Sequence, residues 1–281
     1  MERFWRCDGD HLCVSEYWNR VVKVFTAAGE QIRIVPTLEP NLDPPRRPYR
    51  LVFSPESDAF LAVGWGIEEV ERQEGVIMRT VAPTWLLDKN GNLVQDFGEY
   101  LSAERFLIRG STGGFTIAPH PFGRAVSFAL THDEIFLGTG EKFEVSVFDQ
   151  QGVMVRKLRG PPDDLEVTDE LTNAYRAADL SGDAEEDRRF WERGGSPMPE
   201  AVPAFTDMRV DPEGNLWVER FTPPGTTENR WAVFARAGEF LGHLEFPAGF
   251  FLSEVGSDWV IGIHTDDLGV DRVQVFGMQK G

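Results

Sequence analysis

Cysteine, positive charge and long apolar runs are all scarce in this 281-residue sequence. Its 2 cysteines are too few for a disulfide framework or a cysteine-based zinc cluster. No apolar run reaches the roughly 18 residues of a membrane helix, so we predict no membrane span. Acidic residues number 46 and basic residues 28, and the resulting net charge of −18 repels phosphate backbones. We therefore do not expect nucleic acid as a partner.

The first residues also lack a secretion signal. Residues 1–7 (MERFWRC) contain neither an apolar core nor a small-residue cleavage site, so we expect no signal peptide in the sequence as written. Cys7 and Cys13 flank a short stretch, and a hairpin there would bring the two thiols close. A disulfide between them would indicate an oxidising compartment. We favour two free thiols in a pair of strands.

Motifs for catalysis and cofactors are absent as well. The glycine-rich stretch 109–114 (RGSTGG) has no lysine and no clear strand-to-helix context, unlike a phosphate-binding loop. There is no Gly-x-Ser-x-Gly nucleophile elbow, and none of the 5 histidines stands at metal-ligand spacing from another. The acidic stretch 179–187 lacks the alternating oxygen ligands of a calcium loop. We predict no catalytic residue set, no metal ligands and no cofactor.

The sequence does contain an internal repeat. Its pattern is two strand-like residues, a short polar stretch, a glycine and another strand, as in VFDQQG at 147–152. The glycine supplies the positive φ that a β-hairpin turn requires. The copies lie at residues 24–29, 86–91, 147–152, 233–238 and, one residue longer, 275–281.

A second repeated pattern precedes each copy. It is a polar turn followed by a short alternating strand, as in DPEGNLWV at 211–218, with one more strand upstream, such as residues 124–130. Each unit therefore predicts four antiparallel strands in about 40 residues, the length of a β-propeller blade. A β-sandwich also contains short strands with Gly and Asp turns. Recurrence of the same turns in the same order favours the propeller.

We predict one all-β domain, a β-propeller of four-stranded antiparallel blades, with a helical insertion at residues 161–202. Within the insertion, Thr168 resembles an N-cap and apolar residues follow at helical spacing as far as Tyr175 and beyond. A second helix is expected at about 183–193, which makes a two-helix insertion. Five blades are visible, at about residues 2–36, 48–99, 104–160, 203–247 and 249–281.

The blade turns resemble those of NHL-like six-bladed β-propellers, and residues 211–218 are the most typical piece. More specifically, the chain resembles uncharacterised bacterial six-bladed propeller proteins of the NHL-like and TolB-like superfamily. The segments that carry this resemblance are PHPFGR at 119–124, LEVT at 165–168 and VQVF at 273–276. The resemblance implies a six-bladed ring and brings no catalytic residues with it.

The last repeat ends at its turn glycine, without a fourth strand. Propellers commonly close by letting an N-terminal strand complete the last blade. No residues upstream of Arg3 can supply that strand, so we expect an upstream strand and blade to be missing. A missing N-terminal segment would also leave room for export to the cell envelope. Five blades that close imperfectly are the alternative.

Ligands of propellers usually meet the central channel, where the innermost strands converge. Arg124 offers a planar fork for a carboxylate or phosphate, although we favour its pairing with Asp207 or Glu254 to join blades. His120 lies between two prolines in a stiff loop, where we favour a structural role over that of a catalytic base. The candidate ligand-binding residues are Arg50, His120, Arg124, Ser127, Asp207, Arg209 and Glu254.

Two functions remain open at this point. The first is a non-enzymatic propeller that binds an unknown protein or small molecule. In that case Tyr175, Phe190 and Trp191 of the insertion either dock a partner or seal the insertion onto the ring, and we favour sealing. The second is a metal-dependent hydrolase or lactonase in the central channel, which would use carboxylates from several blades.

Overall fold

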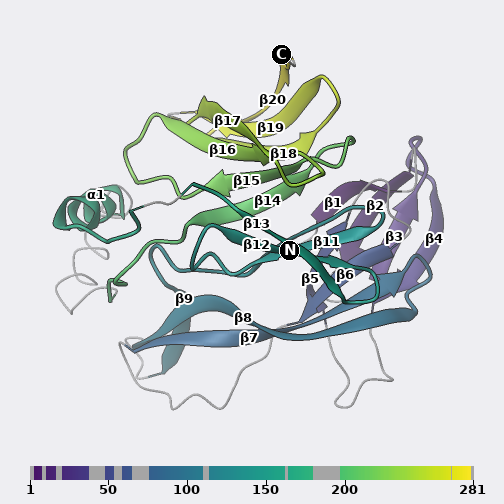
Figure 1. Cartoon of the computed structure of the whole chain (residues 1–281), viewed down its shortest axis with the longest axis horizontal. Helices are drawn as coiled ribbons and strands as arrows, with labels where there is room; N and C mark the ends of the chain where they lie inside the picture. The colour runs from purple at the N-terminus through teal and green to yellow at the C-terminus, as the bar shows by residue number, and fades with distance from the viewer. Residues whose placement is uncertain are drawn as a thin grey trace.

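The computed structural model describes residues 3–7, 11–16, 21–37, 48–53, 59–64, 76–109, 114–161, 164–179, 197–266 and 268–279. Strands make up most of these residues, together with one α-helix, α1 (Asp169–Asp179) (Figure 1). The strands form five separate antiparallel sheets, which we number first to fifth in chain order. Within the described ranges, no helix has the length and apolar character needed to cross a membrane.

Consecutive strands pair with each other in every sheet, so each sheet is an antiparallel meander. The first sheet contains β1 (Arg3–Cys7), β2 (His11–Glu16), β3 (Val21–Phe25) and β4 (Gln31–Pro36). The second contains β5 (Pro48–Phe53), β6 (Ala59–Gly64), β7 (Ile77–Asp88), β8 (Leu93–Arg109) and β9 (Phe115–Pro119). The third contains β10 (Ser127–Leu130), β11 (Glu134–Gly138), β12 (Glu144–Asp149) and β13 (Met154–Arg159). The fourth contains β14 (Phe205–Val210), β15 (Leu216–Arg220), β16 (Glu228–Phe234) and β17 (Phe240–Pro247). The fifth contains β18 (Phe250–Val255), β19 (Trp259–Thr265) and β20 (Asp271–Gly277).

Four of the five predicted hairpin turns form as the sequence predicts, and the end of the fifth copy, at Gly281, lies outside the described residues. Between β12 and β13, Gly152 has a φ of +79°, and its N–H donates to the carbonyl of Asp149 over 3.0 Å. The Asp149 carboxylate also accepts hydrogen bonds from the N–H groups of Gln151 and Val153. Gly29, Gly91 and Gly238 have positive φ values in the corresponding turns. These turns are therefore determined locally, by a glycine that tolerates the left-handed conformation and, in two of them, by an Asx turn.

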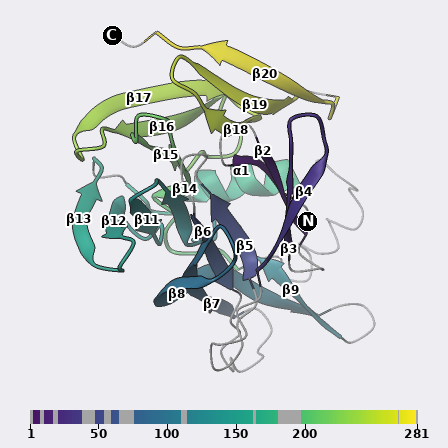
Figure 2. The same cartoon turned by 90° about the vertical axis from the view of Figure 1, so that its right-hand side faces the viewer.

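The sheets stack face to face, and each pair of neighbouring sheets encloses an apolar core. Trp85 of the second sheet lies in the core shared with the first, and Phe128 of the third lies in the core shared with the second. Phe205 and Phe250 fill the next two cores in the same way. The first strands β5, β10, β14 and β18 lie side by side along the stack. Figure 2 shows the sheets arranged around β5 and β14, with β4, β13, β17 and β20 at the periphery. This arrangement is consistent with a β-propeller.

Helix α1 stands at the start of the insertion, where its N-cap was predicted. The Thr168 hydroxyl accepts a hydrogen bond from the N–H of Leu171 over 3.2 Å, and Asp169 and Glu170 follow in the first turn. At the base of the insertion, Val202 N–H donates to the Leu165 carbonyl over 2.8 Å. The second predicted helix, with Phe190 and Trp191, lies outside the described residues.

The second sheet departs from the predicted blade boundaries. We expected a blade to end near residue 99 and the next to begin near 104, but β8 runs through both positions. It pairs with β7 as far as Ile77 opposite Phe106, and β9 then pairs with the end of β8. Residues 104–109 and 115–119 therefore belong to the second sheet, not the third. The boundary of this sheet is therefore set by the long hairpin of β7 and β8, and the spacing of the repeats does not predict it.

Two further expectations need correction. The innermost strand that we expected at 124–130 is shorter and covers only β10 (Ser127–Leu130). The backbone of Arg124 lies outside this strand because it pairs with Glu104, whose N–H donates to the Arg124 carbonyl over 2.9 Å. Cys13 is disulfide-bonded, whereas we expected free thiols. The other cysteine of the sequence, Cys7, lies in β1, which pairs with β2. Cys7 is opposite His11, and Cys13 follows His11 by two residues along β2. The hairpin between β1 and β2 creates that proximity.

Candidate functional site

The structure places five of the seven candidate residues on the first strands of their sheets. Arg50 lies in β5 and Ser127 in β10, Asp207 and Arg209 lie in β14, and Glu254 lies in β18. The other two, His120 and Arg124, lie in the connection between β9 and β10. The candidates therefore divide into a group on the inner strands and a group on this connection.

On the inner strands, one carboxylate stands between two guanidinium groups. Arg209 Nη1 lies 2.7 Å from Asp207 Oδ2, and Arg50 Nη2 lies 3.8 Å from Asp207 Oδ1. Asp207 and Arg209 point to the same face of β14 because they are two residues apart. All three side chains are partly accessible to solvent. We call these residues the Arg50–Asp207–Arg209 cluster.

Two neighbours complete this cluster. The Arg209 guanidinium lies over the ring of Phe251 in β18, 5.8 Å from its centroid, so the fifth sheet contributes a cation–π contact. Glu219 in β15 stands directly opposite Asp207 in the register of the hairpin. Its carboxylate accepts a hydrogen bond from the Thr206 hydroxyl over 2.8 Å.

Burial raises the pKa of Glu219, and the negative charge of Asp207 adds to the increase, although the bond from Thr206 opposes it. Glu219 consequently holds its proton to a higher pH than an ordinary glutamate does. Sequence reasoning missed Glu219, although the turn at 211–215 fixes the hairpin register that places it opposite Asp207.

Ser127 and Glu254 do not join the cluster through any hydrogen bond that the structure describes. The Ser127 hydroxyl donates to the backbone carbonyl of Thr206 over 3.0 Å, which links the third sheet to the fourth. Glu254 is half-buried beside a bulge in β18. Ser127 is therefore a structural link between sheets.

Arg124 forms a closed ion pair with Glu104, a residue that we did not predict, and not with Asp207 or Glu254. Its Nε and Nη2 lie 2.8 and 2.5 Å from Glu104 Oε1, and its backbone N–H donates to Oε2 over 2.9 Å. Burial would raise the pKa of Glu104, which is 5% exposed, but the hydrogen bonds and charge of Arg124 outweigh it and lower that pKa. The pKa of Arg124 is raised, mainly by the same side-chain hydrogen bond. One carboxylate thus neutralises one arginine.

His120 is buried beside this pair, at 6% exposure, with its ring edge-on to Phe106 at 6.0 Å. Neither ring nitrogen meets hydrogen-bond geometry with a described residue. Burial lowers its pKa, and the nearby carbonyls of Pro121 and Pro197 offset only part of that effect. His120 is therefore a neutral packing group at pH 7, which fits the structural role that we favoured.

The same connection contains Phe122, whose φ of +53° is in the left-handed region. The Phe122 ring packs against Tyr175 of α1 at 5.1 Å and against Phe221 at 5.3 Å. Tyr175 thus contacts the body of the protein, as expected if it seals the insertion. These aromatic contacts stabilise the turn at Phe122 in the connection between β9 and β10.

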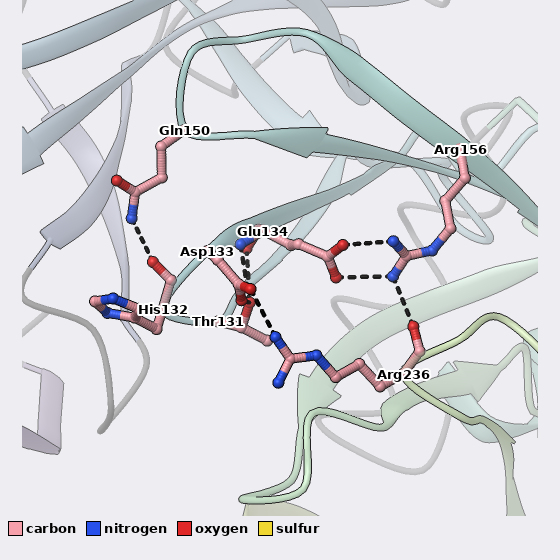
Figure 3. Close-up of polar contacts among 7 residues, drawn as sticks. All are labelled: Thr131, His132, Asp133, Glu134, Gln150, Arg156 and Arg236. Atoms are coloured by element: carbon pink, nitrogen blue, oxygen red, sulfur yellow. Dashed lines mark hydrogen bonds and ion pairs between the residues drawn. The ribbon is translucent and has the colours of Figure 1, made fainter.

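Another polar network joins the third and fourth sheets at their turns (Figure 3). Arg156 donates from both terminal nitrogens to Glu134, and its Nη2 also reaches the Arg236 carbonyl over 2.8 Å. Arg236 Nη2 in turn lies 2.6 Å from Asp133 Oδ2. We call this set the turn-side network. Each charge in it is already matched, so it fastens sheets together.

Comparison with known proteins gives weak structural likenesses. No family model matches the sequence, and no curated protein matches it. A member of the DUF4221 family from Bacteroides vulgatus is 11% identical, with a TM-score of 0.43 over 96% of this chain and 76% of that one. A streptogramin B lyase is 9% identical, with a TM-score of 0.36 over 99% of this chain and 83% of that one. A Kluyveromyces lactis Hsv2 with loop 6CD replaced by a Gly-Ser linker is 12% identical, with a TM-score of 0.34 over 98% and 83%. Likenesses this weak assign no function to the chain.

No group of three or more His, Cys, Asp or Glu side chains that could hold a metal ion occurs in the described part of the chain. The one accessible concentration of charge on the inner strands that we describe is the Arg50–Asp207–Arg209 cluster. Its chemistry is that of anion recognition, because guanidinium groups present forked donors that match carboxylates and phosphates.

Proposed function

We propose that this protein is a β-propeller that binds a small anionic ligand without chemical conversion, through the Arg50–Asp207–Arg209 cluster. The observation that carries the proposal is the arrangement of two guanidinium groups around one aspartate on partly accessible inner strands. A carboxylate or phosphate group of a ligand would accept hydrogen bonds from these guanidinium groups.

The rest of the described chemistry supports binding over catalysis. Arg124 is neutralised by Glu104, and His120 is a buried neutral group beside it. No specific observation favours the alternative of a metal-dependent hydrolase or lactonase, so we do not propose it.

We also propose that the five sheets are successive blades of one ring. The repeated stacking of each sheet on the next supports this, and the resemblance to six-bladed propellers suggests a ring of six. Within this proposal the cluster faces the central channel, the usual ligand position in propellers.

Thermal unfolding with a panel of small anions tests the function. Citrate, succinate, phosphate and sulfate, each added up to about 100 times its dissociation constant, would stabilise the protein by about 2.7 kcal/mol if they bind only the folded state. We expect at least one of them to raise the melting temperature.

Variants then connect that shift to the cluster. Arg50→Gln and Arg209→Gln should abolish it, whereas Arg236→Gln in the turn-side network removes an equivalent charge and should leave it intact. A shift of equal size in all three variants, or no shift with any anion, would contradict the proposal. Calorimetric titration of the wild-type protein with the best anion gives the stoichiometry, which should be one.

A further inference from the structure

Glu219 stands beside the Arg50–Asp207–Arg209 cluster, although the anion-binding function proposed above does not use it. It lies in β15 directly opposite Asp207 of β14, so the two carboxyl groups are on the same face of the fourth sheet. The Cβ atoms of residues in this relation are about 5 Å apart. Arg209 is the diagonal neighbour of Glu219 on that face, within reach of a long side chain. Glu219 is therefore part of the immediate surroundings of the anion site.

The surroundings of the Glu219 carboxyl do little to favour its ionised form. Among the residues that the structure describes, the charged groups that act on it are Asp207 and Arg209, both in β14. In β16, the residue opposite Glu219 is the neutral Trp231, which is 1% exposed. The hydrogen bond from the Thr206 hydroxyl comes from a neutral donor. An ionised Glu219 therefore faces one like charge, one opposite charge and an aromatic neighbour.

Glu104 shows the opposite arrangement. Burial would raise the pKa of Glu104, but the hydrogen bonds and the charge of Arg124 outweigh that effect and lower it. At Glu219, burial raises the pKa, the charge of Asp207 adds to the increase, and the bond from Thr206 and the charge of Arg209 offset only part of it. Glu219 consequently keeps its proton to a higher pH than Glu104 does.

Ionisation of Glu219 changes the anion site in two ways. It adds a negative charge beside Asp207, which repels an approaching anion. It also offers the Arg209 guanidinium a second carboxylate with which to pair in place of a ligand. Both effects lower the affinity for an anion, and both disappear when Glu219 is protonated. Because Glu219 is only half-buried and Thr206 is exposed, protons reach the carboxyl from solvent.

We propose that Glu219 is a positioning residue of the anion site and couples anion binding to proton uptake. The site binds its anion more tightly while Glu219 is neutral and releases it when Glu219 ionises. This role rests on the anion-binding function proposed above. Because coupling is reciprocal, a bound anion raises the affinity of Glu219 for its proton by the same factor. The protein therefore takes up the anion and a proton together, and a rise in pH unloads it.

Affinity measured against pH in the wild type and in Glu219→Gln tests this role. Sulfate is the first probe because its charge is constant over the range, and calorimetric titration from about pH 4 to about pH 8 gives its dissociation constant. We expect the ratio of wild-type affinity to Glu219→Gln affinity to be near unity at acid pH and to fall about fivefold as the pH rises. Citrate, succinate and phosphate are titrated in the same way, because the ratio cancels the ionisation of the probe itself.

Two further variants sharpen the assignment. Glu245→Gln makes the same replacement at an exposed carboxylate of β17, which pairs with Arg230, and should keep the wild-type profile. Thr206→Val removes a hydrogen bond that favours the ionised form of Glu219, so the midpoint of the profile should move to higher pH. Thermal unfolding checks that each variant is folded.

Proton uptake is a measurement that a merely structural role of Glu219 would not change. Titrations with sulfate near the midpoint of the profile, in two buffers of different ionisation enthalpy, give the protons taken up for each anion bound. We expect uptake in the wild type that Glu219→Gln loses, because anion binding and protonation of Glu219 are linked.

These results also separate the role of Glu219 from the anion site itself. If none of the four anions binds the wild type at any pH, the anion-binding function is wrong and the role of Glu219 falls with it. Anion binding with an affinity ratio that does not change with pH would overturn the role of Glu219 alone. Proton uptake that persists in Glu219→Gln, or an unchanged midpoint in Thr206→Val, would overturn it in the same way.

Discussion

Two arginine–carboxylate contacts of this protein differ in the burial of the carboxylate and in stoichiometry. In one, Arg124 and Glu104 form a one-to-one pair whose carboxylate is 5% exposed. In the other, Arg50 and Arg209 share Asp207 on partly accessible strands. The first is a closed pair around a buried carboxylate, so it stabilises the connection between β9 and β10. The second is an open cluster with two guanidinium groups, which in our proposal bind a ligand. Under that proposal, the same residue types serve stability in one place and recognition in the other.

The largest expected effect comes from breaking the closed pair. Arg124→Ala leaves the Glu104 carboxylate buried without its partner, and we expect the free energy of unfolding to fall by about 3 kcal/mol. Denaturant titration followed by tryptophan fluorescence measures this. Replacing both residues, as Glu104→Gln with Arg124→Gln, should recover part of the loss because no buried charge remains. A loss of under about 0.5 kcal/mol for Arg124→Ala would show that the pair behaves as a surface contact.

The open cluster should respond in the opposite direction to loss of its carboxylate. Asp207→Asn removes the one negative charge that lies between Arg50 and Arg209, so we expect anion affinity to rise about tenfold. Calorimetric titration with the best anion of the panel measures the change. The increase should shrink at high salt, because partly accessible charges are screened. Unchanged or weaker affinity would mean that Asp207 is required for recognition and does not compete with the ligand.

The pH dependence of stability should distinguish Glu104, which belongs to the closed pair, from Glu219, which lies beside the open cluster. The pKa of Glu104 is lowered on folding, so its contribution to stability is present above its unfolded pKa and is lost as the pH falls through the folded value. The pKa of Glu219 is raised, so its contribution is present below its unfolded pKa and is lost as the pH rises through the folded value.

Unfolding free energies of Glu104→Gln and Glu219→Gln, measured from acid pH to pH 7, should therefore move apart. Relative to wild type, Glu104→Gln should become less stable as the pH rises toward the unfolded pKa of a glutamate, and Glu219→Gln should become more stable as the pH rises above that value. Parallel curves would show that the environments of the two carboxylates are alike.

The smallest effect is expected in the turn-side network. Asp133→Asn removes the contact with Arg236, and both side chains are exposed, so the loss of stability should be about 0.5 kcal/mol or less. Anion affinity should not change. A loss of stability as large as that of Arg124→Ala would show that an exposed ion pair stabilises the protein as much as one with a buried carboxylate.

Much of the fold could be predicted because its signals are local. Asp149 and Gly152 encode a hairpin turn within four residues, and Thr168 caps α1 within its own first turn. Repetition of such turns along the chain was sufficient to predict short antiparallel strands. The second sheet departed from the spacing because β7 and β8 pair over a longer stretch than the turns reveal.

The site could be predicted only in part. Alternation along β14 placed Asp207 and Arg209 on one face, but nothing in the sequence showed that Arg50, more than 150 positions earlier, would approach them. The partner of Arg124 was also missed, because Glu104 lies on a strand that we assigned to another blade.

The sequence by itself determined the turns, the strand alternation and the excess of negative charge, since each depends on residues close together or on composition. Only the tertiary structure decided which charges are matched and which remain accessible. These depend on the stacking of one sheet against the next, and burial and pairing between distant segments arise only when that stacking is complete.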